Sequence, residues 1–160
     1  MKSAAYWIDR LKLQTHPEGG YFREVYRSQD EMVHPVHNEK RNLATSIYFL
    51  LEGNNISHFH ELDSDELWYF HEGSGAIIHV FEEGKYKKHL LSNAEEGSLQ
   101  VLLPAGCQFA AEVIDQEGYV LMGCVVVPGF DFKDFRLLNK KEMMHKFPGY
   151  EELIGRFCID

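Results

Sequence analysis

The sequence predicts an all-β protein, an antiparallel sandwich or barrel with helices only near the two ends of the chain. Two observations carry this prediction. Short runs rich in aromatic and β-branched residues follow one another from Tyr21 to Val127. Clusters of Gly, Asn, Asp and Pro separate these runs, and such clusters are typical of tight turns. Many short strands joined by tight turns indicate a sandwich or a barrel.

The elements follow in order from the N terminus. Ser3 can cap a short helix in which apolar residues recur at helical spacing from Ala4 to Leu11. A turn rich in Pro and Gly ends this helix at residues 17–20. Residues 28–41 show no stable period and are expected to form an ordered loop. The predicted strands cover residues 21–27, 44–51, 56–60, 66–71, 76–81, 85–91, 99–103, 108–113 and 119–127.

Two short helices are expected near the C terminus. Asn139 and Glu142 have the spacing of a capping box, which marks the start of a helix. Pro148 and Gly149 end that helix. Residues 150–157 can form one or two further helical turns.

Length and charge limit the classes of function. The 160 residues are expected to form one domain over 1–160. A chain of this size buries about 70% of its unfolded surface, so it needs no disulfide or metal to fold. The formal charge of -9 argues against nucleic acid or an anionic membrane surface as a main partner, because both require a basic face.

The cysteines and the apolar runs indicate a cytoplasmic protein. Cys107, Cys124 and Cys158 are odd in number and form no CxxC pair, which argues against a disulfide framework and fits a reducing compartment. The N-terminal residues contain no apolar stretch of the kind found in secretory signals. The most apolar run, residues 120–127, is too short to span a bilayer.

The residues with the clearest chemical pattern are His58, His60 and Glu66. The two histidines lie two positions apart, so a strand places both imidazoles on one face. Glu66 opens the next predicted strand, and a hairpin can bring its carboxylate beside the two rings. Two imidazoles and one carboxylate suit Zn, Fe, Mn, Ni or Co and leave positions open for water or substrate. The alternative is that the histidines only form hydrogen bonds in a polar pocket.

This pattern resembles the first motif of the cupin superfamily. The motif consists of a Gly, an HxH pair, a Glu and a second Gly, and Gly53, His58, His60, Glu66 and Gly73 fill these places. The three central residues are therefore expected to meet in space. The resemblance makes them candidate ligands of a divalent metal (Zn, Fe, Mn or Ni) and candidate catalytic residues.

The second cupin motif differs from its metal-binding form. It is similar to Gly97 followed by Pro104-Ala-Gly106, after which metal-binding cupins have a third His ligand. Here Phe109 stands at that position, and a phenyl ring cannot ligate a metal. Gln108 or Cys107 could replace the missing ligand only if a bulge turned it inward. The departure favours weak or absent metal binding.

Longer segments resemble one branch of the superfamily, the fifth cupin domain family. They are HPEGGYFREVYRS from His16, TSIYFLL from Thr45, SHFHELDSDELWYFHEG from Ser57 and VPGFDFKDF from Val127. The resemblance implies a double-stranded β-helix, or jelly-roll barrel, with short terminal helices, and it implies a homodimer. Members of this family have no assigned function and are similar in fold to sugar-nucleotide epimerases of the rhamnose pathway. Fold does not supply a reaction.

The first predicted strand carries further candidates. Strict alternation places Arg23 and Arg27 on one face, and Glu24 and Tyr26 on the other. If this strand lines the pocket, Arg23 can pair with a substrate anion, and Tyr26 or Glu24 can position a hydroxyl. The alternative is an edge strand with a solvated charged face or a dimer contact. Arg41, just before the next strand, is a weaker candidate of the same kind.

Two hypotheses for function follow. In the first, the protein is an isomerase, epimerase or lyase acting on a sugar or small acid, with a metal at His58, His60 and Glu66 or with one His as general base. In the second, the same pocket captures a small polar or anionic ligand without catalysis or bound metal. Trp68 and Phe70, which share parity with Glu66, are expected to pack in the core.

Overall fold

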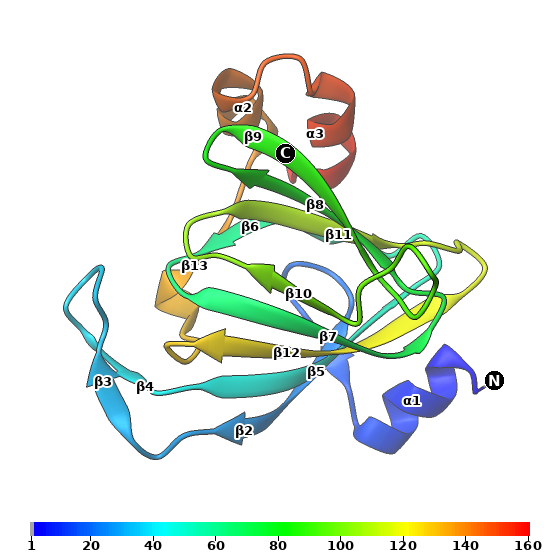
Figure 1. Cartoon of the computed structure of the whole chain (residues 1–160), viewed down its shortest axis with the longest axis horizontal. Coiled ribbons are helices and arrows are strands. Elements are labelled where there is room, and N and C mark those ends of the chain that lie inside the picture. The colour runs from blue at the N-terminus through cyan, green and yellow to red at the C-terminus, as the bar shows by residue number, and fades with distance from the viewer. Residues whose placement is uncertain (1) are drawn as a thin grey trace.

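The computed structural model describes residues 2–160 and consists of two antiparallel sheets with helices on their outer faces (Figure 1). The larger sheet has the order β1-β2-β5-β12-β7-β10, and the smaller has the order β13-β6-β11-β8-β9. The larger sheet comprises β1 (Gln14–Thr15), β2 (Tyr21–Arg27), β5 (Thr45–Glu52), β7 (Asp65–Gly73), β10 (Gln100–Leu103) and β12 (Tyr119–Val127). The smaller sheet comprises β6 (Ser57–Leu62), β8 (Ala76–Glu82), β9 (Lys85–Leu91), β11 (Gln108–Val113) and β13 (Phe135–Leu137).

The nine predicted strands are all present, and their ends differ from the prediction by at most two residues. The segment expected to be a loop at residues 28–41 is more regular than predicted. It contains β3 (Glu31–Val33), which pairs with β4 (Lys40–Asn42) in a separate hairpin. Strands of two or three residues show too little alternation to be recognised from sequence, and this also explains the missed β1 and β13.

The main core lies between the two sheets. Alternate residues of β5, β7, β8, β11 and β12 point inward and are apolar, as a half-buried sheet requires. Trp68 is 1% exposed in this core, and Phe70 packs against it, so both aromatic residues are confirmed as core residues. Phe109 is buried in the same cluster.

Helices cover part of the outer face of each sheet. α1 (Ala4–Leu11) begins at Ser3, whose side chain accepts a hydrogen bond from Tyr6, and it packs on Leu50 and Leu121 of the larger sheet. α2 (Lys140–Lys146) is capped by Asn139 as predicted. α2 and α3 (Glu151–Phe157) cover the smaller sheet at the opposite end of the molecule (Figure 1). Within residues 2–160, no helix is both long enough and apolar enough to cross a bilayer.

The backbone conformation at the end of β7 gives a test of the packing between β7 and β12 within the larger sheet. Gly73 has φ +111°, and an added Cβ would lie 2.0 Å from the backbone oxygen of Tyr119. We expect Gly73→Ala to lower the free energy of unfolding by more than about 2 kcal/mol, because strain and a backbone clash add. Chemical denaturation measures this change.

Gly155→Ala is the matched control. Gly155 lies inside α3, and nothing lies within 4 Å of its added Cβ. Alanine is the better helix former by about 0.5–1 kcal/mol, so this variant is expected to be slightly more stable. Equal effects of the two substitutions would contradict the close approach at Gly73.

Candidate functional site

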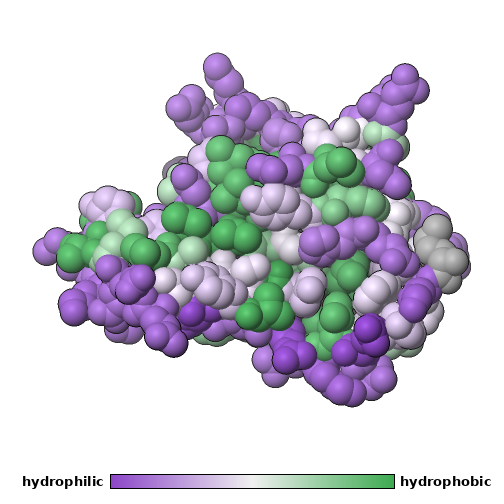
Figure 2. Space-filling view, turned by 60° about the horizontal axis from the view of Figure 1, so that its bottom comes forward, coloured by the Kyte–Doolittle hydropathy of each residue, from purple (hydrophilic) through white to green (hydrophobic). Residues whose placement is uncertain are grey.

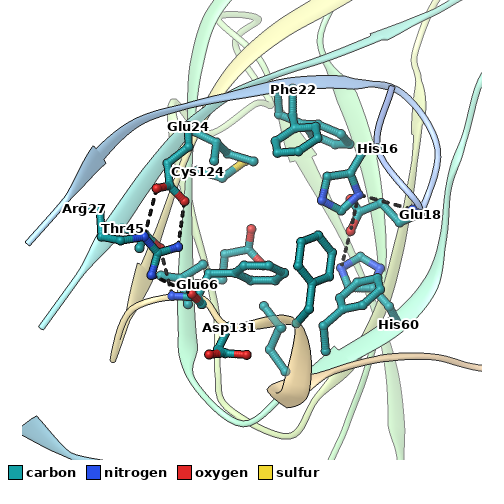
Figure 3. Close-up of a pocket in the computed structure, with 17 residues that line it drawn as sticks. His16, Glu18, Phe22, Glu24, Arg27, Thr45, His60, Glu66, Cys124 and Asp131 are labelled. Atoms are coloured by element: carbon teal, nitrogen blue, oxygen red, sulfur yellow. Dashed lines mark hydrogen bonds and ion pairs between the residues drawn. The ribbon is translucent and has the colours of Figure 1, made fainter. Parts of the chain in front are cut away.

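A cavity of about 310 Å³ opens at one end of the space between the sheets (Figure 3). Its volume is that of a site for a small molecule. β2, β5, β7 and β12 contribute to its wall from the larger sheet, and β6 does so from the smaller sheet. The segment from Phe130 to Phe135, which includes the short helix η1 (Phe132–Asp134), completes the wall. The polar or ionisable lining residues are His16, Glu18, Glu24, Arg27, Thr45, His60, Glu66, Cys124 and Asp131.

The backbone of Glu18 is fixed by the strand that carries the HxH pair. The backbone N–H of His58 and its Nδ1 both lie 2.8 Å from the carbonyl oxygen of Glu18. A carbonyl oxygen only accepts, so His58 Nδ1 carries a proton and donates it there. Gly19 allows this approach, because its φ is +110° and an added Cβ would lie 1.9 Å from the oxygen of Ile56. The turn at residues 17–20 therefore places a carboxyl group in the cavity.

Glu18 and His60 form a close, buried pair. His60 Nδ1 donates to the carbonyl of His58 at 2.7 Å, so its Nε2 carries the lone pair in the neutral ring. That Nε2 lies 3.2 Å from Oε2 of Glu18, a contact that requires a proton on one partner. Burial raises the pKa of Glu18, and burial lowers the pKa of His60 to about 4. Both directions favour the neutral pair, in which Glu18 carries the proton.

Two more groups complete the surroundings of the Glu18 carboxyl. Ser57 Oγ donates to Oε1 of Glu18 at 2.8 Å. His16 Nδ1 accepts the backbone N–H of Glu18 at 3.2 Å and lies 3.6 Å from its Oε2. Because Nδ1 accepts, His16 is in the tautomer protonated at Nε2, and burial lowers its pKa. Sequence reasoning missed His16 and Glu18, although the HPEGG turn before a predicted strand contained both.

Among residues 2–160, Glu66 is one of the buried side chains that have a polar atom without a hydrogen-bond partner. It is 6% exposed, and its Oε2 forms no hydrogen bond. Burial raises its pKa to about 8, and the nearby Glu18 contributes in the same direction. At neutral pH the group is therefore mostly the uncharged acid, which can donate a proton to a bound molecule.

A β-bulge changes which residues of β2 reach the cavity. The register against β5 shifts between Glu24 and Tyr26, so Glu24 and Arg27 line the cavity. Tyr26 is 56% exposed, and Arg23 donates from Nη1 to the carbonyl of Leu11 at 3.0 Å. Neither Arg23 nor Tyr26 lines the cavity. Arg23 lies on the opposite face from Glu24 by ordinary alternation, and the bulge turns Tyr26 away from the cavity.

The expected metal ligands do not form a metal site. His60 and Glu66 both line the cavity, whereas His58 does not and has its Nδ1 engaged by Glu18. Among residues 2–160, His58, His60 and Glu66 do not form a group whose ligating atoms lie within 4.8 Å of one another. The Phe109 ring lies 4.1 Å from the His60 ring, centroid to centroid. These residues therefore do not fit the metal centre of other cupins.

Gln108 and Cys107, the possible substitutes for the third histidine ligand, do not line the cavity either. Gln108 donates to Glu61 and to the carbonyl of Gly106. Cys107 lies in the main core, and burial raises its pKa to about 12, so it is an inert thiol.

A second cluster lies beside the β3–β4 hairpin. The ligating atoms of His34, His37 and Asp134 lie within 4.8 Å of one another, so this cluster could hold a metal ion. The two imidazole rings stack at 4.0 Å, and His34 Nε2 lies 3.1 Å from Ser64 Oγ. Arg41 donates from Nε and Nη2 to the two oxygens of Asp134, each at 2.7 Å. Arg41 is thus part of a buried ion pair, and a metal would compete with it for Asp134.

The chain is similar to known proteins over most of its length. The family model described as "Cupin superfamily (DUF985)" matches residues 5–138. An uncharacterized protein of Saccharomyces cerevisiae is 30% identical over 91% of this chain and 80% of its own length.

Solved structures are similar over the whole chain. A hypothetical protein from Leishmania major superposes with a TM-score of 0.92 and 33% identity, covering 99% of this chain and 100% of its own. A Shewanella oneidensis protein gives a TM-score of 0.89 and 35% identity, covering 99% of both chains. Oxalate decarboxylase from Bacillus subtilis shares the fold alone, with a TM-score of 0.57 and 18% identity over 89% of this chain and 36% of its own.

The ionisation of Glu66 gives a test of the site. Its pKa is about 8 in the folded chain and close to 4.5 when exposed, so between these values only the folded state holds the proton. Stability contributed by this group is present below pH 4.5 and is lost as the pH rises, by up to about 1.4 kcal/mol per pH unit. Glu66→Gln removes this dependence. As the pH rises from about 5 to about 8, the melting temperature of the wild type should therefore fall relative to that of the variant.

Scanning calorimetry of both proteins across this range measures the difference. Glu117→Gln, in an exposed turn, is the control and should leave the pH profile unchanged. Parallel profiles for Glu66→Gln and the wild type would mean that Glu66 is ionised in the folded protein.

Proposed function

We propose a function for this chain, which belongs to the Cupin superfamily (DUF985): it binds a small molecule in the barrel cavity and transfers protons on it through the Glu18–His60 pair. Isomerases, epimerases and lyases all use such proton transfer. The observation that supports the proposal best is the contact of 3.2 Å between Glu18 Oε2 and His60 Nε2, with the other imidazole nitrogen fixed as a donor.

Each residue of the pair has a defined part. Glu18 can donate the shared proton to an electronegative atom of the ligand, which leaves a carboxylate beside a neutral imidazole. The carboxylate or His60 Nε2 can then accept a proton from a carbon of the same ligand. His58 is a positioning residue, because it holds the Glu18 carbonyl and orients His60 through its own carbonyl. Glu66 offers a polar contact to the ligand from the facing sheet.

Deuterium exchange tests the proton transfer. A metabolite extract is incubated with the protein in D₂O and analysed by mass spectrometry for ligands that gain mass. We expect exchange with the wild type and a loss of about 100-fold or more with His60→Gln or Glu18→Gln, which matches the usual contribution of a general acid or base. Glu117→Gln, outside the cavity, should exchange at the wild-type rate.

The alternative is a non-catalytic cupin that binds a small ligand without a metal. In that case ligands contact the cavity in saturation-transfer NMR, and none of them exchanges hydrogen for deuterium. That combination of results would replace the proton-transfer proposal.

We also propose that the homodimer implied by the family resemblance forms through the outer face of the larger sheet. Directly paired residues share a face of a sheet, and the pairing places one row across five strands. The row consists of Leu102, Leu67, Val125, Ser46 and Tyr26. Leu102 is 51% exposed and Tyr26 is 56% exposed. Hydrophobic side chains are also interspersed with hydrophilic ones on the face that carries β2 and α1 (Figure 2).

Light scattering after size exclusion tests the dimer. We expect the wild type to have twice the mass of one chain, and Leu102→Glu to have the mass of a single chain, because the charge would be buried without a partner. Glu117→Gln should remain dimeric. A wild-type protein that is monomeric at all accessible concentrations would contradict the proposal.

A further inference from the structure

The cavity is lined by more acidic than basic side chains. Glu18, Glu24, Glu66 and Asp131 supply four carboxyl groups, whereas Arg27 is the lining residue with a permanent positive charge. Arg27 is already engaged, as Figure 3 shows for its contact with Glu24. Its Nε and Nη2 donate to the two carboxylate oxygens of Glu24 at 2.9 and 2.7 Å. A ligand carboxylate or phosphate therefore meets a guanidinium whose charge is already paired with Glu24.

The two N–H groups of Arg27 Nη1 are also used. Its Nη1 donates to Asn42 Oδ1 at 2.8 Å and to the carbonyl of Phe130 at 3.0 Å. These bonds hold the guanidinium against the segment that closes the cavity. Rotating it toward an anionic ligand would break several charge-assisted hydrogen bonds at once.

One buried acidic atom in the cavity lacks any partner. Glu66 Oε2 is buried without a hydrogen bond among residues 2–160, and the whole residue is 6% exposed. An unmade hydrogen bond of this kind is costly, and a ligand donor that reaches it would remove the cost. A cationic donor would also stabilise the ionised carboxylate that burial alone disfavours.

Aromatic rings surround the same space. Phe130 and Phe132 meet edge to face at 4.9 Å between ring centroids, and Phe135 lies 6.0 Å from Phe130 and 6.1 Å from Phe132. Phe132 is 55% exposed, which places it where the cavity meets solvent. Ring faces attract organic ammonium groups, and carboxylates beside them add to the attraction.

We infer that the cavity binds a small organic cation, an amine whose ammonium group pairs with Glu66 among the phenyl rings. The inference rests on the proposed function, because it uses the same cavity, and it specifies the class of ligand. It differs from the anionic ligand expected from sequence and from the sugar nucleotides of the resembling epimerases. The diphosphate of such a nucleotide would lie among Glu24, Asp131 and an arginine that is already paired.

A matched series of probes tests the inference. Cyclohexylamine, cyclohexanol and cyclohexanecarboxylate have the same ring and differ in charge. Their binding is measured by titration calorimetry at pH 7 in two buffers of different ionisation enthalpy. We expect the amine to bind at least about tenfold more tightly than the alcohol, since a hydrogen bond to a charged group is worth that factor. Binding of the carboxylate should be undetectable.

Proton release identifies the group involved. Glu66 is mostly protonated at pH 7, so pairing with an ammonium group should release nearly one proton per amine bound. Glu66→Gln should abolish that release and remove the preference for the amine over the alcohol. Glu117→Gln is the control and should bind the amine as the wild type does.

Several outcomes would overturn the inference. Equal binding of amine and alcohol, tighter binding of the carboxylate, no binding of any probe, or amine binding retained in Glu66→Gln would each do so. Zn²⁺ or Mn²⁺ that binds more tightly than the amine and is lost in Glu66→Gln would replace the organic cation with a metal ion. None of these results removes deuterium exchange that depends on His60 and Glu18, so failure of the ligand class is distinguishable from failure of the proposed function.

Discussion

The hydrogen bonds between His58 and the carbonyl of Glu18 are the contacts on which the candidate site depends. They attach the turn at residues 17–20 to β6 and leave the Glu18 carboxyl inside the barrel. On the same strand, Ser57 contacts one oxygen of this carboxyl group and His60 contacts the other. One strand thus holds the backbone of the acid, donates a hydrogen bond to it and carries its imidazole partner.

The opposite face of that strand ties the site to the rest of the fold. Phe59, between the two histidines, is fully buried against Phe81 and Phe157 beneath the C-terminal helices. Because its neighbours point to the other side, the packing that fixes Phe59 also fixes the direction of His58 and His60. The orientation of the imidazoles is therefore set by an apolar core on the far side of the sheet, and no metal is needed to hold them.

The alternation of side chains along a β-strand predicted their directions correctly where the strands are regular. It placed His60 and Glu66 toward the cavity, and Trp68 in the core. The prediction failed in β2, where a bulge places Arg27 in the cavity wall and turns Tyr26 away from it. A bulge cannot be recognised from a single sequence. Alternation also could not show that His58 would turn its Nδ1 to a backbone carbonyl. The acid Glu18 was missed because its role depends on contact with a strand about forty residues away.

Phe109 accounts for the burial of the His60 imidazole. Its ring occupies the position next to His60 where a third imidazole would otherwise complete a set of ligands, and the two rings meet at 4.1 Å. A phenyl ring offers no lone pair to a metal, but it removes water from the imidazole and so disfavours the charged form. The pKa of His60 falls to about 4 as a result of burial, and its neutral ring faces a carboxyl that keeps its own proton. An apolar ring beside His60 thus favours the neutral imidazole that the proposed proton transfer requires, and it offers no ligand atom to a metal.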